Sequence, residues 1–221
     1  MKAAISRIVL GTDWMTAVPN LAAWNMAPAN RADAIMNSAV EMGINAFDTA
    51  RMYWSEGVVG RFVRQHPSGR EAFWIVSKGG HPSLFGKPLT RKRLFRQLDH
   101  SLRALGSDYI DVYLLHYDDE RVPAQAISEW SIELLRSGKI RNIGYSNVSL
   151  ARLKELCACL REANAVPWVS NEFNVFAAAG GRWKGAQNIS CDRTYVEYLR
   201  ENRVPFLAYS SLGRGDLKRT D

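Results

Sequence analysis

The sequence predicts an α/β fold of the (β/α)8 barrel type, and three observations support this prediction. Short apolar segments of strand length alternate with amphipathic segments of helix length along the 221 residues. Strands and helices alternating at this spacing form a parallel sheet with right-handed crossovers. Polar residues follow several apolar segments at their carboxyl ends, where a barrel assembles its site from successive loops. The turn after the first strand has no G-x-G-x-x-G pattern, which argues against a doubly wound nucleotide-binding sheet.

The composition is that of a globular protein. Hydrophobic residues make up 47% of the chain and charged residues 23%, which are ordinary values. No apolar run approaches the roughly 20 residues that span a bilayer, and the N-terminus lacks the features of a signal peptide. We therefore expect a soluble cytoplasmic protein without a membrane partner. Its cysteines, Cys157, Cys159 and Cys191, are expected to be reduced thiols.

The formal net charge of +7 raises the question of nucleic-acid binding. One basic cluster begins a predicted helix and a second lies near the end of the chain; they comprise Arg91, Lys92, Arg93 and Arg96, and Arg214, Lys218 and Arg219. We expect neither cluster to be interleaved with exposed aromatic residues, so no nucleic-acid partner is predicted. The first cluster is interpreted as a solvated helix face. The second stays open, because a phosphate-bearing small ligand would use one or two such cations.

Seven apolar segments are predicted as strands, and each is bounded by polar or glycine residues. They comprise residues 7–11, 44–48, 72–77, 108–115, 140–144, 166–170 and 204–209. Helices are predicted to begin at or near Asn30, Ser55, Thr90, Pro123, Ser149 and Asp192, and Gly43, Gly106 and Gly138 are predicted to end three of them. Hydroxyl side chains at helix starts make good N-caps, which we expect at Ser55, Thr90 and Ser149.

Polar residues at the ends of different predicted strands are the candidate site. Residues 43–57 (GINAFDTARMYWSEG) form one strand, a polar turn and the start of a helix, with Asp48 where the strand ends. Lys78, His116 and Asn147 stand at or just beyond the ends of three later strands. The carboxyl ends of parallel strands meet at one rim of a barrel, so these side chains are expected to converge.

Five segments, in this order and at these separations, resemble the aldo-keto reductase family: GINAFDTARMY, IVSKGG, SLRALGSDYIDVYLLHYDD, SGKIRNIGYSN and AYSSLGRG. The resemblance runs from about Arg7 to the last residues. It implies a (β/α)8 barrel that reduces small-molecule aldehydes and ketones with NADPH, without metal or flavin. Carried over residue by residue, the family's catalytic tetrad falls on Asp48, Tyr53, Lys78 and His116.

The chemistry of carbonyl reduction suits these residue types. Hydride delivery leaves negative charge on oxygen, so a proton donor must meet that oxygen as the charge develops. Tyr53 is the candidate acid, and a nearby Lys78 ammonium would lower the phenol's pKa from about 10. Asp48 would keep Lys78 charged and in place. His116 would donate a hydrogen bond to the substrate oxygen and orient the carbonyl.

The resemblance also implies a cofactor site. Ser146 and Asn147 would hydrogen-bond the nicotinamide carboxamide, Tyr209 would stack on the ring, and Ser170 stands where the family usually has glutamine. The remaining cofactor residues belong to the first and seventh strand-to-helix loops and comprise Gly11, Thr12, Ser210, Leu212 and Arg214. Asp48 borders the same site.

The chain stops at Asp221, soon after the seventh predicted strand. We therefore expect a single barrel domain over residues 1–221 that lacks the eighth strand and last helices of the family, with the edges of the first and seventh strands unpaired. The family's basic residues for the adenosine 2′-phosphate lie in that part, so NADPH as cofactor rests on the resemblance.

Other interpretations stay open. Each candidate residue taken singly has a structural explanation, and the whole chain could be an inactive fragment or a reductase-like binding or regulatory module. An aldolase-type barrel with Lys78 as a Schiff-base lysine is a third hypothesis, although a Schiff base requires a neutral amine. The other histidines show no metal-ligand spacing. Trp54 and the loop 177–190 with Trp183 are expected to line the pocket mouth.

Overall fold

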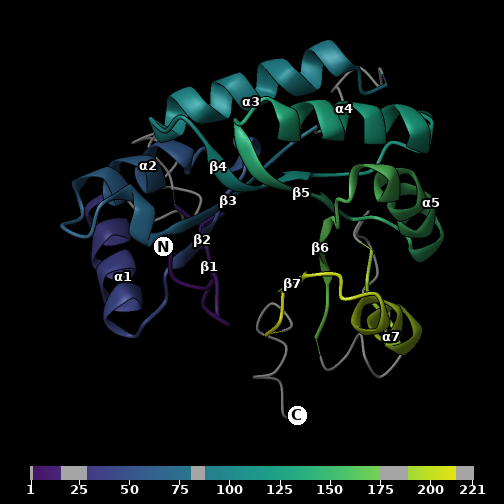
Figure 1. Ribbon diagram of the computed structural model, residues 1–221. Helices are drawn as coiled ribbons and strands as arrows, with labels where there is room; N and C mark the ends of the chain where they lie inside the picture. The colour runs from purple at the N-terminus through teal and green to yellow at the C-terminus, as the bar shows by residue number, and fades with distance from the viewer. Residues whose placement is uncertain (1, 16–28, 81–87, 175–188, 213–221) are drawn as a thin grey trace. The chain divides into compact units, whose positions relative to one another are not determined.

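Figure 1 shows the computed structural model of the chain, which describes residues 2–15, 29–80, 88–174 and 189–212. The chain divides into two compact units. The first comprises residues 1–81, 89–113 and 134–142, and the second comprises 82–88, 114–133 and 143–221. The prediction of a single domain stays a prediction, and each unit is described by itself. In the described part, no helix has the length and apolar character to cross a membrane.

The first unit contains the strands at the start of the sheet and the helices packed on them. Its strands are β1 (Leu10–Gly11), β2 (Ala46–Asp48), β3 (Trp74–Gly79) and the start of β4 (Ile110–Leu115). Its helices are α1 (Ala29–Glu41), α2 (Glu56–Gln65) and α3 (Arg91–Leu105), with short 3-10 turns η2 (Arg51–Tyr53) and η3 (Arg70–Ala72). In Figure 1, α1 and α2 lie beside one another. β1 pairs with β2, and β2 with β3, in parallel register.

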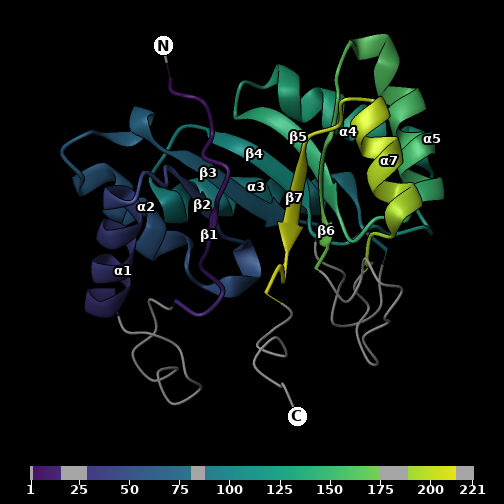
Figure 2. The same ribbon diagram turned by 90° about the horizontal axis from the view of Figure 1, so that it is seen from below.

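The second unit contains the later strands. They are the end of β4, most of β5 (Ile140–Ser146), β6 (Trp168–Glu172) and β7 (Phe206–Tyr209). Its helices are most of α4 (Ala124–Arg136), α5 (Leu150–Leu160) and α7 (Arg193–Glu201), with the 3-10 turn η4 (Arg161–Ala163). β5 pairs with β6 and β6 with β7, again in parallel. Figure 2 shows β6 and β7 next to one another.

The seven strands follow one another in the sheet in the order in which they occur in the chain. This sequential order is that of a (β/α)8 barrel, and with seven strands in the described residues the fold is an incomplete barrel of this type. The predicted fold class is confirmed. Strand bounds differ by a few residues: β1 begins at Leu10, β3 continues through Lys78 and Gly79, and β5 continues to Ser146. Backbone pairing sets these bounds, and it can include polar residues that end an apolar run.

Helix starts follow the predicted caps at Thr90 and Ser149, whose side chains accept the backbone N–H of Arg93 and Arg152. Ser55 occupies the predicted N-cap position of α2, but its side chain does not cap the helix. Ser55 precedes α2 with helical backbone angles and makes no cap hydrogen bond, because its hydroxyl is used elsewhere. Gly106 ends α3 in the left-handed conformation, as its C′ position predicts. Arg91, Lys92 and Arg96 on α3 are exposed to solvent.

Helices α2 and α3 approach so closely that no side chain fits between them at Gly60. A Cβ at Gly60 would lie 2.2 Å from the carbonyl oxygen of Leu105 and 2.5 Å from its Cα. Both atoms belong to the α3 backbone and cannot swing aside. At Gly57, one turn earlier on α2, the nearest atom to a Cβ would be the Ala104 oxygen at 4.0 Å. The backbone contact therefore depends on glycine at position 60.

We predict opposite effects of alanine at these two positions of α2. Gly60→Ala should destabilise the protein by about 2 kcal/mol or more, because α2 and α3 must move apart. Gly57→Ala has room and should be neutral or stabilising by up to about 1 kcal/mol, since alanine favours helix. Urea denaturation followed by circular dichroism measures both. Equal stability of the two variants would contradict the close contact at Gly60.

Candidate active site

The first unit places a partly buried ion pair at the ends of two neighbouring strands. Asp48 ends β2, and Lys78 lies near the end of β3. The Lys78 Nζ is 2.6 Å from Oδ1 of Asp48 and also donates to the Thr49 carbonyl at 3.1 Å. The Lys78 side chain is 3% exposed and that of Asp48 is 21% exposed. Lys78 therefore meets its partners inside the protein, while Asp48 retains some contact with solvent.

Tyr53 joins this pair from the short turn η2. The Lys78 Nζ lies 4.9 Å from the centroid of the Tyr53 ring, which is cation–π distance. The backbone N–H of Tyr53 donates to the Ala50 carbonyl at 3.0 Å, which fixes the turn. The structure thus brings Asp48, Tyr53 and Lys78 together within one unit. Their chemical roles stay predictions.

Two opposing effects act on Asp48. Burial disfavours the carboxylate and raises the pKa of Asp48 above its usual range. The Lys78 ammonium opposes this rise through its charge and its hydrogen bond. The ion pair therefore offsets the cost of placing a carboxylate at the end of a buried strand.

A chain of hydroxyl groups lies behind the ion pair. Thr12 donates to the Asp48 carbonyl at 2.9 Å, and its oxygen lies 2.9 Å from Oγ of Ser55, which in turn lies 2.7 Å from Oγ1 of Thr49. Because a hydroxyl has a single proton, Ser55 donates to Thr12 and Thr49 donates to Ser55. Thr12 is fully buried, whereas Gly11 is exposed. The cofactor contacts predicted for Gly11 and Thr12 stay predictions.

Glu56 is buried beside β3 and does not face solvent as a first-turn residue usually does. It is 2% exposed, and its Oε1 accepts the hydroxyl of Ser77 at 2.7 Å. Its other oxygen, the Ser101 hydroxyl and the Tyr113 hydroxyl are buried without a hydrogen-bond partner among the described residues. Burial raises the pKa of Glu56, while the neighbouring hydroxyls of Ser101 and Ser77 and the positive charge of Arg51 oppose this rise. The carboxyl group is thus held in an environment that favours its neutral form.

The second unit carries the predicted histidine and most of the predicted cofactor residues. His116 directly follows β4, is 5% exposed, and stacks on Tyr117 with ring centroids 4.9 Å apart and planes 10° apart. Its carbonyl accepts the side-chain amide of Asn147 at 3.0 Å. His116 is therefore fixed through its backbone by the residue that follows β5.

Asn147 is the most heavily bonded polar residue of this group. Its Nδ2 donates to the His116 carbonyl and, at 3.2 Å, to Ser146, and its Oδ1 accepts the Tyr209 hydroxyl at 2.5 Å and the Ile189 N–H at 3.4 Å. These bonds use all four hydrogen-bonding positions of an amide. Its backbone has φ of 55°, in the left-handed region that asparagine tolerates better than most residues. Asn147 therefore links the ends of three strands, β4, β5 and β7.

The other predicted cofactor residues surround this centre. Ser146 and Ser170 are buried at paired positions of β5 and β6, and Ser210 follows β7 with φ of 52°. Leu212 is 73% exposed. Arg214, Lys218, Arg219 and Trp183, with most of the loop 177–190, lie outside the described residues. Trp54 is 57% exposed, and its place at a pocket mouth stays a prediction.

A buried arginine supports the loop after His116, and sequence patterns did not indicate it. Arg152 of α5 is 8% exposed, bonds Oδ2 of Asp118 at 3.0 Å and donates to the Val122 carbonyl. It lies in a predicted helix, where arginine usually faces solvent. The sequence pattern that could have revealed its burial is an arginine on an otherwise apolar helix face.

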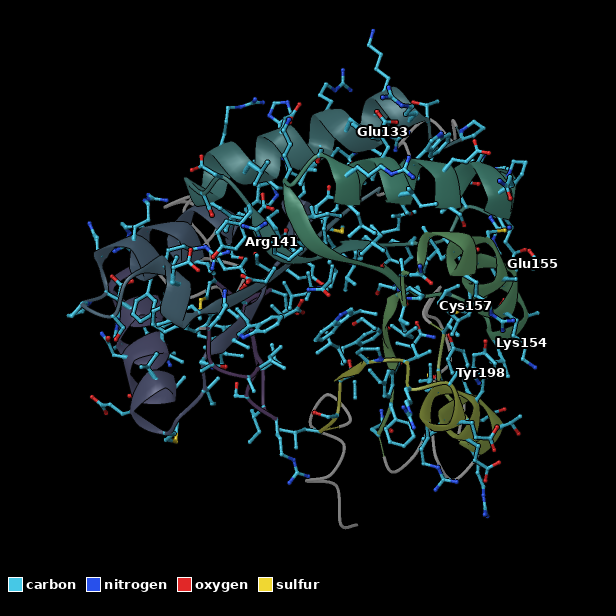
Figure 3. The ribbon with its side chains drawn as sticks, in the orientation of Figure 1. Glu133, Arg141, Lys154, Glu155, Cys157 and Tyr198 are labelled. Atoms are coloured by element: carbon cyan, nitrogen blue, oxygen red, sulfur yellow. The ribbon has the colours of Figure 1, made fainter. Side chains whose placement is uncertain are left out.

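The cysteines are free, and two of them belong to α5. Figure 3 labels Cys157 and Lys154 on α5 near Tyr198 on α7, and the Lys154 Nζ lies 5.3 Å from the Tyr198 ring centroid. Burial raises the pKa of Cys157 and raises that of Cys191 to about 12, so both thiols stay protonated at neutral pH. No group of three potential metal ligands occurs in the described part of the chain.

Comparison with known proteins gives the family. The model of the aldo/keto reductase family matches residues 7–221. The chain belongs to the aldo/keto reductase family. The protein is 28% identical over 217 residues to aldo-keto reductase YhdN of Bacillus subtilis, a match that covers 95% of this chain and 59% of the relative. It is 28% identical over 193 residues to L-glyceraldehyde 3-phosphate reductase of Escherichia coli, covering 82% of this chain and 53% of that protein.

Solved structures of aldo/keto reductases share the fold. The crystal structure of an aldo/keto reductase from Klebsiella pneumoniae in complex with NADP and acetate superposes with a TM-score of 0.73 at 24% identity. The match covers 99% of this chain and 68% of that chain. This aldo/keto reductase chain therefore spans a little more than half the length of the curated relatives given above.

Removing the carboxylate at position 48 should test how much the partly buried Lys78–Asp48 ion pair stabilises this aldo/keto reductase. Asp48→Asn leaves the Lys78 ammonium buried without its charge partner and should cost about 1–3 kcal/mol, less than a fully buried pair because Asp48 is partly exposed. Asp99→Asn is the matched control, since the Lys139–Asp99 pair is 48% and 43% exposed. It should cost less than about 1 kcal/mol. Chemical denaturation at pH 7 measures the free energy of unfolding of both variants. Equal losses of stability in Asp48→Asn and Asp99→Asn would contradict this prediction.

A second prediction concerns pH. The raised pKa of Glu56 means that its contribution to stability is complete below the ordinary value of 4.5 and is lost as pH rises through the folded-state pKa. Glu56→Gln removes this dependence. The difference in melting temperature, variant minus parent, should therefore become more positive as the pH rises above 4.5. Glu129→Gln, at an exposed position on α4, should show a constant difference, and a constant difference for Glu56→Gln would refute the burial effect.

Proposed function

We propose that this chain carries out the carbonyl reduction of its family, transferring a hydride from NADPH to an aldehyde or ketone with Tyr53 as the general acid. The observation that carries the proposal is the contact of Lys78 with both Asp48 and Tyr53. The Lys78 Nζ is 2.6 Å from the Asp48 carboxylate and 4.9 Å from the Tyr53 ring centroid. A buried ammonium beside a phenol is the arrangement that makes the phenol a stronger acid.

The proton step follows from these positions. NADPH, when bound, supplies the hydride that reaches the carbonyl carbon. The Tyr53 hydroxyl gives its proton to the carbonyl oxygen as negative charge develops there, and the phenolate that remains is stabilised by the Lys78 ammonium. Asp48 holds that ammonium in place and balances its charge. Solvent returns the proton to Tyr53 after the alcohol leaves.

His116 acts from the end of β4. An imidazole N–H donates a hydrogen bond to the substrate oxygen and so orients the carbonyl. Two features limit its movement: the stacked ring of Tyr117 and the Asn147 amide on its carbonyl. A histidine fixed in this way loses little entropy when substrate binds.

The donors around Asn147 fit a nicotinamide carboxamide. An amide group needs both donors and acceptors, which the Ser146 hydroxyl and the Asn147 amide supply. All four positions of Asn147 are used, but its bond to the Ile189 N–H is long at 3.4 Å and is the one a carboxamide would replace. Tyr209 is tied to Asn147 through its hydroxyl, which leaves a ring face for stacking. Ser170, Ser210, Leu212, Gly11, Thr12 and Arg214 complete the proposed site.

The proposed substrate is a small-molecule carbonyl. Exposed aromatic and apolar side chains next to Tyr53, Trp54 at 57% and Met52 at 43% exposure, suit a substrate with an apolar or aryl part. One relative is named for the reduction of L-glyceraldehyde 3-phosphate. A phosphate at the substrate would need a basic partner in addition to these side chains.

The competing hypotheses fit less well. A Schiff-base lysine must be neutral, whereas Lys78 is paired with a carboxylate at 2.6 Å. A binding or regulatory module would not need the Tyr53 contact with Lys78. That contact favours catalysis.

Tyr53→Phe should abolish turnover and leave cofactor binding intact, because only the acidic hydroxyl is removed. NADPH oxidation at 340 nm with a panel of aliphatic and aryl aldehydes measures turnover, which should fall by at least about 100-fold. Fluorescence titration measures NADPH binding, which should change by less than about threefold, since a hydroxyl that acts in the transition state adds little to ground-state affinity. Tyr198→Phe, on α7 of the second unit, is the control and should keep full turnover. Unchanged turnover in Tyr53→Phe would exclude Tyr53 as the acid.

A further inference from the structure

The turn that carries Tyr53 is bonded to three strands by the two residues that begin the next helix. Ser55 bonds Thr12, which follows β1, and Thr49, which follows β2. Glu56 accepts the hydroxyl of Ser77 in β3. All three of these contacts lie within the first unit. The two side chains face the sheet, although their position at a helix start predicts caps and a solvent-facing first turn.

These bonds connect directly to the catalytic pair. Ser77 immediately precedes Lys78 in β3, and Thr49 immediately follows Asp48 and accepts a bond from Lys78 through its carbonyl. Ser55 and Glu56 themselves follow closely after Tyr53. The same few bonds therefore hold the Tyr53 turn against the strand ends that bear Asp48 and Lys78.

The backbone between Tyr53 and Ser55 is strained. Trp54 has φ of 62°, in the left-handed region, which costs a bulky residue about 1 kcal/mol or more. Such a conformation persists only where the surroundings hold it in place. Tyr53 is fixed on one side by its bond to Ala50, and Ser55 is fixed on the other by its two hydroxyl partners. The hydrogen bonds of Ser55 and Glu56 therefore keep Trp54 in this strained conformation.

We infer that Ser55 and Glu56 form an anchor, the Ser55–Glu56 anchor, that positions the Tyr53 hydroxyl relative to Lys78 in the catalytic geometry. Both are positioning residues, since they act through Tyr53 and Lys78 and do not touch the reacting atoms. Burial gives these bonds their strength: Ser55 is fully buried and Glu56 is 2% exposed. Hydrogen bonds in such a low-dielectric environment are stronger than at the surface, and breaking one leaves a buried polar group unpaired.

The inference rests on the proposed function and adds the residues that make its geometry possible. A glutamine at position 56 keeps the acceptor for Ser77, so Glu56→Gln should preserve the anchor. Glu56→Ala removes the bond to Ser77, and Ser55→Ala removes the bonds to Thr12 and Thr49. Val63→Ala, at a fully buried apolar position of the same helix, disturbs α2 without touching the anchor and controls for loss of stability.

Two measurements test the anchor. The first is the single-turnover rate of aldehyde reduction with saturating NADPH. Ser55→Ala and Glu56→Ala should slow it about tenfold to hundredfold, because a small misplacement of a catalytic group has effects of this size. Glu56→Gln and Val63→Ala should stay near the parent rate and near the parent NADPH affinity.

The second measurement does not need turnover. The protein is labelled with 3-fluorotyrosine, and the Tyr53 line in the 19F spectrum is assigned by its absence in Tyr53→Phe. The line should keep its shift in Glu56→Gln and Val63→Ala and should move or broaden in Ser55→Ala and Glu56→Ala. An unchanged line in both alanine variants would overturn the anchor, whatever the rates. A parent protein without turnover would refute the proposed function alone, since the 19F comparison would still decide on the anchor.

Discussion

The contact of Lys78 with Asp48 is the constraint on which the rest of the site depends. A lysine side chain with 3% exposure is unfavourable without a charge partner, and the Asp48 oxygen at 2.6 Å supplies one. Because β2 and β3 are parallel neighbours, their carboxyl ends lie at the same edge, and the two charges meet without distortion of the sheet. Tyr53 then needs only a short turn after β2 to reach the same ammonium.

Hydroxyl groups around the Lys78–Asp48 pair fix the loops that follow β1 and β2. Thr12, Thr49 and Ser55 form one hydrogen-bonded chain that begins at the Asp48 carbonyl. In the second unit, Asn147 connects His116 and Tyr209 through hydrogen bonds to the His116 carbonyl and the Tyr209 hydroxyl. Each unit therefore has a set of polar residues that ties strand ends together beside side chains proposed for catalysis or cofactor binding. This is how a barrel rim can combine fixed catalytic groups with variable loops.

The order of the strands and the polar residues at their ends could be predicted from the sequence. Apolar runs at regular spacing mark buried parallel strands, and the polar residue after each run marks the rim. Strand bounds were less accurate, since backbone pairing continues through Lys78 and Ser146 after the apolar pattern stops. Ser55 stands at the predicted N-cap position of α2 but does not cap it, because a hydroxyl before a helix has the same local sequence pattern whether it caps the helix or bonds the sheet. Only the tertiary neighbours Thr12 and Thr49 distinguish the two cases.

The central claim is that the Lys78 ammonium makes Tyr53 a usable acid. Its most direct test is a titration of the Tyr53 phenol by difference absorbance at 295 nm, with Tyr53→Phe subtracted, in the parent protein and in Lys78→Met. The account predicts a Tyr53 pKa below the ordinary value of about 10 in the parent and a higher pKa in Lys78→Met. The same pKa in both proteins would contradict it.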